Sequence, residues 1–382
     1  MIHRPDMPCS SHWELWRAAR RILCVRLDQL GDVVMTSPAF RAIKESIPGC
    51  RVTLLTSPGG AEAARLMPFV DDVLTYEAPW MKATNNAADA ASDRRFIERL
   101  RAASFDAAVV FTVYSQNPLP SALMCYLADI PLRLAHCREN PYHILTDWVR
   151  DQEAEKFVCH ATRRQLDLVN FIGARTLDER LSISVPASAR IQIESLLQQL
   201  LDDSCERWIV MHPGASASSR RYAPENYALV TRQLVEEMDC QVIFTGTASE
   251  CSLIETIRAQ AGVPSHSVAG LLDLGQLAAL LERAPLLISN NTGTVHIAAA
   301  VGTSVLDLYA LTNPQHMPWR VPHRVLFHDV PCRFCYKSIC PEGHHDCLRL
   351  VSPTRVVTAA RELLAIRPLA TTGGAQLVHA RH

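Results

Sequence analysis

Short β-rich runs and amphipathic helical segments alternate along this chain, and the same plan starts twice. The predicted strands cover residues 22–27, 51–55, 106–111 and 132–135 in the first half, and 208–212, 241–245, 286–289 and 305–308 in the second. Such alternation is typical of parallel sheets covered by helices. A chain of 382 residues is also too long for one ordinary core. The sequence therefore predicts an α/β protein with two Rossmann-like domains, 21–185 and 189–352, that face each other across a cleft.

The remaining features of the chain concern its ends and its charge. Residues 1–20 lack the apolar stretch of a secretion signal, so we expect a cytoplasmic N-terminal extension, and residues 367–382 are predicted to be a flexible tail. No run of 18 apolar residues occurs, so no spanning helix is expected. Lys plus Arg number 38 against 39 for Asp plus Glu, which is not the basic excess of a nucleic-acid binder. We therefore expect no nucleic-acid partner.

Ligands of open α/β sheets bind beyond the carboxyl ends of the strands, near helix N-termini. After the first predicted strand, Gly31 permits a tight turn or a close approach of ligand, and Asp32 follows at the start of a predicted helix. Asp is a favoured helix cap, and it is also a general base when it faces a cleft. The spacing alone leaves both roles for Asp32 open.

Two later loops have the composition of anion sites. The loop at 212–222 contains Gly214, Ser216 and Ser218 ahead of Arg220, and hydroxyls with a guanidinium suit a diphosphate. A solvated loop is the alternative. The loop at 289–296 would present amides and hydroxyls at a helix N-terminus, and it contains Asn291, Thr292, Gly293 and His296.

Taken in order, these loops resemble those of glycosyltransferase family 9, the bacterial heptosyltransferases of lipopolysaccharide synthesis. The matching stretches are 26–38 (RLDQLGDVVMTSP), 212–224 (HPGA…RRYAP), 290–302 (NNTGTVHIAAAVG) and 308–318 (LYALTNPQHMP). The resemblance implies a GT-B fold with the acceptor on the first domain and the donor on the second. It also implies that a C-terminal helix at 353–366 packs back towards the first domain.

The resemblance further implies an inverting transfer of heptose from ADP-heptose to a hydroxyl of the lipopolysaccharide inner core, with no cofactor required for the chemistry. Asp32 matches the family's proposed general base, and Arg220 stands where the family has Lys or Arg to stabilise the leaving diphosphate. Glu250 resembles the acid that meets the ribose, and Leu272 lies in the segment that would line the base. A lipid-bound acceptor would bring the protein to the cytoplasmic face of the inner membrane.

Two places depart from the family pattern or are not assigned by it. Family members commonly have an acid ahead of Thr-Gly, where this chain has Asn291, which leaves the donor sugar open. The segment 114–149 would face a lipopolysaccharide or other glycan acceptor. The residues there that could meet acidic sugars or phosphates, or form a solvated surface, are Tyr114, Arg133, His136 and Arg138.

A cysteine cluster lies near the C-terminus. Its four thiols have the compact spacing of a tetrahedral Zn²⁺ or iron site, and related protein heptosyltransferases hold iron in cysteine ligands. Reduced, packed or redox-labile thiols are the alternative, because the second pair is not C-x₂-C. The four residues are Cys332, Cys335, Cys340 and Cys347.

Other functions remain open on the same fold. They are a family transferase with a different donor or a protein acceptor, a nucleotide-sugar 2-epimerase, and a non-catalytic scaffold that holds a metal.

Overall fold

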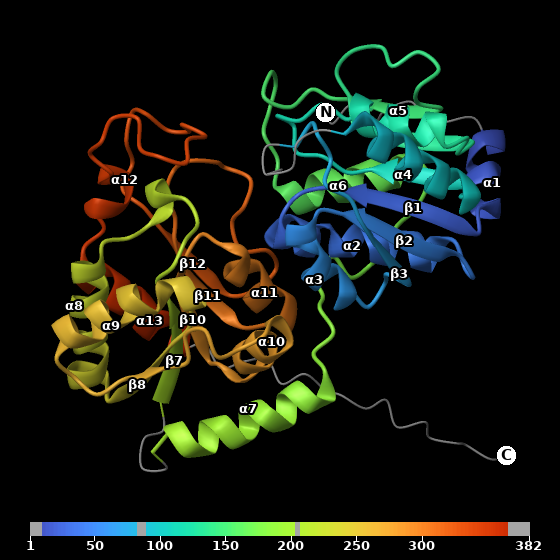
Figure 1. The fold of residues 1–382 in the computed structure, drawn as a ribbon. Helices are drawn as coiled ribbons and strands as arrows, with labels where there is room; N and C mark the ends of the chain where they lie inside the picture. Colours follow the sequence, from blue (N-terminus) through green and yellow to red (C-terminus); the bar gives the residue numbers. More distant parts are fainter. Residues whose placement is uncertain (1–9, 82–88, 203–206, 366–382) are drawn as a thin grey trace, which may run out of the picture.

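The computed structural model describes residues 10–81, 89–202 and 207–365. It contains two parallel six-stranded sheets, each with its own helices, and the two domains stand side by side (Figure 1). The predicted α/β class is confirmed.

The first domain is built around the sheet β3-β2-β1-β4-β5-β6, in which all neighbouring strands are parallel. Its strands are β1 (Arg21–Arg26), β2 (Arg51–Thr56), β3 (Asp72–Thr75), β4 (Ala107–Val110), β5 (Leu132–Cys137) and β6 (Asp147–Arg150). Its helices are α1 (Ser10–Ala18), α2 (Leu30–Ser46), α3 (Pro58–Arg65), α4 (Ala90–Ala102), α5 (Leu119–Leu127) and α6 (Ala161–Phe171).

The second domain repeats the plan with the sheet β12-β11-β10-β7-β8-β9. Its strands are β7 (Arg207–His212), β8 (Cys240–Phe244), β9 (His266–Ser267), β10 (Leu286–Asn290), β11 (Ser304–Leu308) and β12 (His323–Leu326). Its helices are α7 (Ala187–Leu200), α8 (Pro224–Met238), α9 (Cys251–Ala261), α10 (Leu274–Arg283), α11 (Gly293–Val301), α12 (Asp346–Arg349) and α13 (Pro353–Ala365), with short 3₁₀ turns η1 (Ser218–Arg220) and η2 (Ala248–Glu250).

Strand β1 shows how the sequence builds a core on both faces of a sheet. Leu23 and Val25 belong to the apolar cluster formed with α4 and α5, whereas Ile22 and Cys24 belong to the cluster formed with α2 and α6. Successive side chains of a strand point to opposite faces, and both faces of a parallel sheet are covered. This is why β1 is an almost continuous apolar run.

One apolar cluster continues from the first domain into the second. It joins buried side chains of α2 and α6 to those of α10 and α11, and α2 packs directly against α11. Side-chain packing therefore connects the domains, in addition to the chain that leads into α7 at the bottom of Figure 1.

The N-terminal extension is not separate from the first domain. Residues 10–18 form α1, and Trp16 is only 1% exposed within the shared apolar cluster. Its indole Nε1 donates to Asp147 Oδ2 at 3.1 Å. The expectation of an extension at 1–20 is therefore wrong for residues 10–20, because a buried tryptophan anchors this helix. Residues 1–9 and the predicted tail at 367–382 lie outside the described residues.

The C-terminal helix does not pack as the family resemblance implies. Helix α13 lies against α8 and against β10, β11 and β12. Its apolar face, with Val356, Val357, Ala360 and Leu363, is buried in the cluster of the second domain. The expected return towards the first domain is therefore corrected, and the physical reason is that this face is already covered by its own domain.

We expect Trp16→Ala to lower the free energy of unfolding by about 3–5 kcal/mol, because it deletes a buried aromatic side chain and leaves a cavity. Urea denaturation followed by circular dichroism measures the change. Leu15 on the same helix is 53% exposed, so Leu15→Ala is the control and should change stability by less than about 0.5 kcal/mol. Equal effects of the two substitutions would show that α1 is not docked in solution.

Candidate active site between the domains

A cavity of about 1060 Å³ opens between the two domains. Its floor consists of the loops that follow β7, β8 and β10, and α2 and α3 of the first domain close one side. These loops lie at the carboxyl ends of parallel strands, where ligands of α/β sheets bind. Of the residues predicted to bind the donor, the cavity is lined by Ser216, Glu250, Leu272, Thr292 and Gly293.

Two helix N-termini, one from each domain, meet at the edge of this cavity. A Cβ atom on Gly31 would lie 2.9 Å from His296 Cδ2 and 3.3 Å from the Cα of Gly293. A Cβ on Gly293 would lie 2.8 Å from Leu30 Cδ2. Gly31 therefore lies within the first turn of α2, where it permits close approach of the two domains and not the tight turn that the sequence left open. The amide ends of α2 and α11 converge, and such ends favour negative charge.

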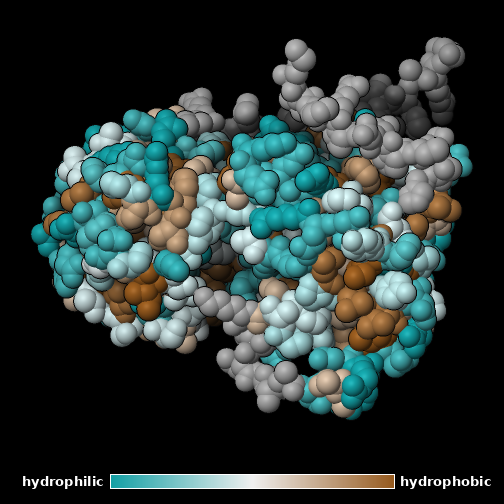
Figure 2. Space-filling model, turned by 90° about the horizontal axis from the view of Figure 1, so that it is seen from above, coloured by the Kyte–Doolittle hydropathy of each residue, from teal (hydrophilic) through white to brown (hydrophobic). Residues whose placement is uncertain are grey.

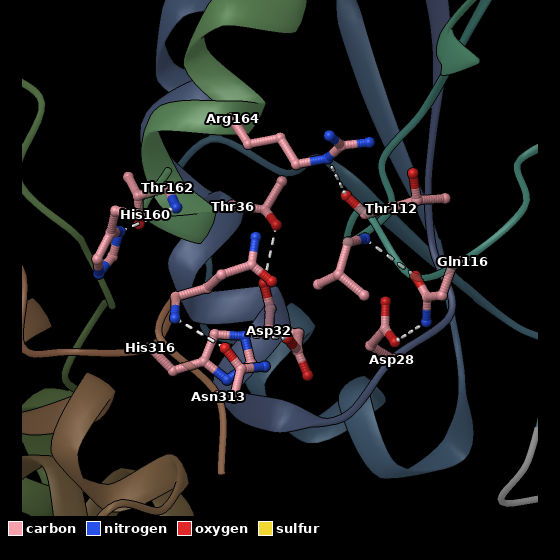
Figure 3. Close-up of polar contacts among 12 residues, drawn as sticks. Asp28, Asp32, Thr36, Thr112, Gln116, His160, Thr162, Arg164, Asn313 and His316 are labelled. Atoms are coloured by element: carbon pink, nitrogen blue, oxygen red, sulfur yellow. Dashed lines mark hydrogen bonds and ion pairs between the residues drawn. The ribbon is translucent and has the colours of Figure 1, made fainter. Parts of the chain in front are cut away.

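Asp32 lies in the first turn of α2 and forms an ion pair with the buried Arg26. The distance from Arg26 Nη2 to Asp32 Oδ1 is 3.1 Å, and Arg26 Nε lies 3.2 Å from Asp28 Oδ2. Gln116 Nε2 donates to Asp28 Oδ1 at 2.6 Å. Figure 3 shows Asp32 between Asp28 and His316, with Gln116 on the far side of Asp28. The N-cap residue of α2 is Gln29 and not Asp32, whose carboxylate lies between Arg26 and His316 and does not line the cavity.

Arg26 and Asp28 were not among the site residues predicted from the sequence. Both lie in the stretch that resembles the family, but the end of a strand gives no sign that an arginine there is buried. Burial raises the pKa of Asp28, and the charge of Asp32 raises it further, whereas Arg26 and the hydrogen bond from Gln116 lower it. The two carboxylates thus share one buried cation, which fixes the position of both.

The two arginines of the second loop point to different places. Arg221 lines the cavity, and its Nε donates to Ala215 O at 2.8 Å. Arg220 ends the 3₁₀ turn η1, and its buried Nε has no hydrogen-bond partner among the described residues. Arg220 does not line the cavity, and its charge adds to burial in lowering the pKa of His316 to about 3. An unpaired buried donor of this kind suits an anionic ligand.

The loop after β10 supplies further unpaired groups. Thr292 is the N-cap residue of α11 but makes no capping bond, and its buried Oγ1 has no partner within the described ranges. His296 is buried one turn later, and burial lowers its pKa well below the usual value, so the ring is neutral. Its Nδ1 is likewise unpaired in the described part of the chain.

The remaining residues predicted for the donor have structural contacts. Glu250 Oε2 accepts from Thr247 N at 2.8 Å, and its carboxylate lies where a Cβ on Gly214 would fall, so Gly214 makes room for it. Ser218 Oγ donates to Ser338 O at 3.3 Å and does not line the cavity. Asn291 is buried, and its amide donates to Asp307 Oδ2 at 3.0 Å and to His316 O at 2.8 Å.

The residues predicted for the acceptor fall into two groups. Arg133 is buried and donates to the carbonyls of residues 130, 131, 143 and 144, and His136 is buried with Nε2 at 3.1 Å from Arg164 O. Both side chains hold the first domain together, and we do not assign them to the acceptor. Tyr114 instead reaches the second domain, where its hydroxyl donates to that of Tyr336, and Arg138 donates to Tyr114 O.

The four cysteines of the cluster lie around one narrow pocket with His344 and His345. Cys332 Sγ is 3.9 Å from His344 Nε2, and burial raises the pKa of the Cys347 thiol. Among the described residues, no group of three or more His, Cys, Asp or Glu side chains is arranged to hold a metal ion. The suggested structural Zn²⁺ or iron site is therefore not supported.

Comparison with known proteins identifies the family. The model of glycosyltransferase family 9 (heptosyltransferase) matches residues 93–345, which is well over half of the chain. The chain is 24% identical over 362 residues to lipopolysaccharide heptosyltransferase 2 of Salmonella typhimurium, with 90% of this chain and 99% of that protein covered. It is 28% identical over 327 residues to lipopolysaccharide heptosyltransferase 1 of Pseudomonas aeruginosa, with 84% and 87% covered.

Solved structures agree with the fold. A family 9 glycosyltransferase from Veillonella parvula superposes with a TM-score of 0.75 at 20% identity, covering 91% of this chain and 97% of that one. Escherichia coli ADP-heptose heptosyltransferase II gives 0.68 at 22% identity, covering 90% and 98%. The predicted GT-B fold is confirmed. The chain belongs to glycosyltransferase family 9, and it is a glycosyltransferase.

Burial raises the pKa of Asp307 from 3.8 to about 8, although the hydrogen bond from Asn291 and the charge of Arg220 lower it. The folded protein therefore binds more protons than the unfolded chain between these values, and the free energy of unfolding contributed by this group falls as the pH rises through that window. We expect Asp307→Asn to gain stability relative to wild type between pH about 4 and about 8, measured by urea denaturation.

Asp129, whose side chain is 73% exposed, provides the matched control. Asp129→Asn should show a difference from wild type that is small and changes little with pH over the same window. A pH-independent difference for Asp307→Asn would contradict a buried neutral acid at this position.

Proposed function

We propose that this protein transfers heptose from ADP-heptose to a sugar hydroxyl of the lipopolysaccharide inner core, with inversion at the anomeric carbon. The observation that carries the proposal is that Asp32 lies in the first turn of α2, which contacts the first turn of α11, where the hydroxyl of Thr292 has no partner among the described residues. Relatives named lipopolysaccharide heptosyltransferase support the sugar and the acceptor, and structures of an Escherichia coli heptosyltransferase with ADP and with ADP-2-deoxy-2-fluoro heptose support the donor.

Asp32 is proposed as the general base. It accepts the proton of the acceptor hydroxyl while that oxygen attacks the anomeric carbon and the bond to the diphosphate breaks. Help of this kind is worth about 10²–10⁴-fold in rate. Arg26 holds the carboxylate in place, and Asp28 shares the charge of Arg26 so that Asp32 is not fully neutralised.

The leaving diphosphate gains negative charge as the bond breaks. Arg220, the hydroxyl of Thr292 and the N-terminus of α11 are proposed to stabilise that charge, and Arg221 to contact the nucleotide part in the cavity. Preorganised donors aimed at developing charge are commonly the largest contribution to catalysis. These groups supply the positive potential that a divalent cation supplies in other transferases, so no metal is proposed for the reaction.

Asn291, which departs from the family pattern, does not line the cavity. Its amide nitrogen already donates hydrogen bonds to Asp307 and to the backbone carbonyl of His316. The departure therefore gives no support to a different donor sugar, and heptose remains the proposal.

No helix among the described residues is both long and apolar enough to cross a bilayer. A cytoplasmic protein that contacts the inner membrane peripherally is proposed, because the acceptor is lipid-bound. Apolar residues are exposed on the lobe of the first domain (Figure 2), and α5 contributes Leu123, Tyr126 and Leu127 at 42%, 46% and 43% exposure.

The test combines ligand binding with transfer. ADP or ADP-heptose should raise thermal stability, by about 2.7 kcal/mol at one hundred times the dissociation constant, more than UDP or GDP conjugates do. Asp32→Asn should lower kcat for transfer about 10²–10⁴-fold with little change in melting temperature, because Asn has the same shape and Arg26 keeps Asp28. Asp129→Asn is the control for a lost carboxylate.

Chelation with EDTA should leave kcat unchanged, because only protein groups stabilise the leaving group. Selective binding of UDP or GDP would remove heptose as the donor, and full activity of Asp32→Asn would remove the proposed base. Loss of activity in EDTA, restored by one divalent ion, would contradict the metal-independent chemistry.

A further inference from the structure

The loop between β11 and β12 crosses from the second domain onto the first. Gln315 Nε2 donates to Glu153 Oε2 at 3.2 Å, and Gln315 O accepts from Ala161 N at 3.0 Å. His160 Nε2 lies 2.8 Å from Met317 O. The residues on both sides of His316 are therefore anchored to the first domain, and its backbone position is defined by both domains together.

The imidazole of His316 is directed at the proposed base. Its Nε2 lies 3.8 Å from Asp32 Oδ1, and this buried atom has no hydrogen-bond partner among the residues that the structure describes. Figure 3 shows His316 on the side of Asp32 opposite Asp28. A buried ring nitrogen without a partner is costly, and the carboxylate of Asp32 is an acceptor within reach of it. A shift of about 1 Å would form a hydrogen bond, and catalytic hydrogen bonds often tighten when substrate binds.

Asn291 and Asp307 hold this histidine from behind. The amide nitrogen of Asn291 donates both to His316 O and to Asp307 Oδ2. An aspartate at position 291 could make neither donation, and it would place a second carboxylate beside Asp307. Asn291, which departs from the family pattern, is therefore the side chain that can donate to both of its partners, the carboxyl of Asp307 and the carbonyl of His316.

We propose that His316 is a positioning residue for Asp32, which holds Oδ1 through Nε2–H from the donor domain while Arg26 holds the same carboxylate from the acceptor domain. The inference rests on the proposed role of Asp32 as general base. It goes further because both domains then orient the base, and they do so only while the loop between β11 and β12 is docked on the first domain. The charged and titratable groups that bear on Asp32 are then Arg26, Asp28, His316 and, beyond His316, Arg220.

Burial, with the charges of Arg220 and Arg26, lowers the pKa of His316 to about 3. The ring is therefore neutral at working pH, and it donates one hydrogen bond without adding a positive charge. Such a donor stabilises the ionised carboxylate relative to the protonated one, so its removal should move the acidic limb of the pH–kcat profile to higher pH.

The experiment compares His316→Phe, which keeps a ring but loses the nitrogen, with His316→Gln, whose amide can still donate. For His316→Phe we expect kcat to fall about 10-fold, the donor KM to change less than about 2-fold, and the acidic limb of the pH–kcat profile to move to higher pH. His316→Gln should keep a higher kcat than His316→Phe. Its acidic limb should also lie closer to that of wild type. His328, exposed on the same domain, gives the control His328→Phe, which should match wild type.

A second measurement needs no activity. In ¹H–¹⁵N spectra of the histidine side chains of the full-length protein, the His316 ring, assigned by its absence in His316→Phe, should shift in Asp32→Asn. An active wild type with unchanged kcat and pH limb in His316→Phe would overturn the inference and leave the proposed function standing. A loss of kcat without movement of the limb or rescue by Gln would show a merely structural role, and would also overturn it. If the wild type shows no transfer activity but the His316 resonance still shifts in Asp32→Asn, the proposed function is contradicted. The contact between His316 and Asp32 is then still supported.

Discussion

The contact between Gly31 and Gly293 is the constraint on which the rest of the cleft depends. Both residues lie in the first turn of a helix, and neither has room for a Cβ, because the opposing helix occupies that space. Glycine is needed here for close approach and not for an unusual backbone conformation. Since Asp32 follows Gly31 and Thr292 precedes Gly293, the same contact brings the proposed base towards the hydroxyl of Thr292, which has no partner within the described ranges.

Electrostatics at this edge depend on one buried cation. Arg26 is completely buried, and removing such a charge from water is costly unless it is paired. Asp28 and Asp32 provide that pairing, so the arginine requires the carboxylates for its burial as much as they require it for orientation. The carboxylate of Asp32 is consequently ordered before any ligand arrives, which is the form of preorganisation that catalysis needs.

Much of this architecture could be predicted from the sequence. The central strands of both sheets are continuous apolar runs, and the loops that follow them place Thr292 and Gly293 at the cavity and Asp32 at the contact between the domains. The edge strands β3 and β6 were not predicted, because four partly exposed residues carry no clear apolar pattern. The same is true of α1, whose anchoring depends on a tryptophan that meets the rest of the domain only after folding.

The roles of single polar residues were harder to predict than the positions of helices and strands. Arg133 and His136 have the side chains of an anion site, but backbone carbonyls accept from a guanidinium as readily as a sugar phosphate does. Asp307 and His316 were not selected as site residues, although His316 lies in the stretch 308–318 that resembles the family. The partners of both are remote in sequence, and one lies in the other domain. Pairings of this kind follow from tertiary packing, which no local pattern encodes.

The apolar cluster that runs from α2 and α6 into α10 and α11 has a consequence for synthesis of the chain. During translation the first domain leaves the ribosome before the surface that covers its α2 face has been made. Until α11 emerges, that face is an uncovered apolar surface of the nascent chain, open to chaperones or to other unfinished chains. A product truncated near residue 185 would keep that surface exposed permanently, so the first half of this protein is expected to be a poor unit for expression by itself.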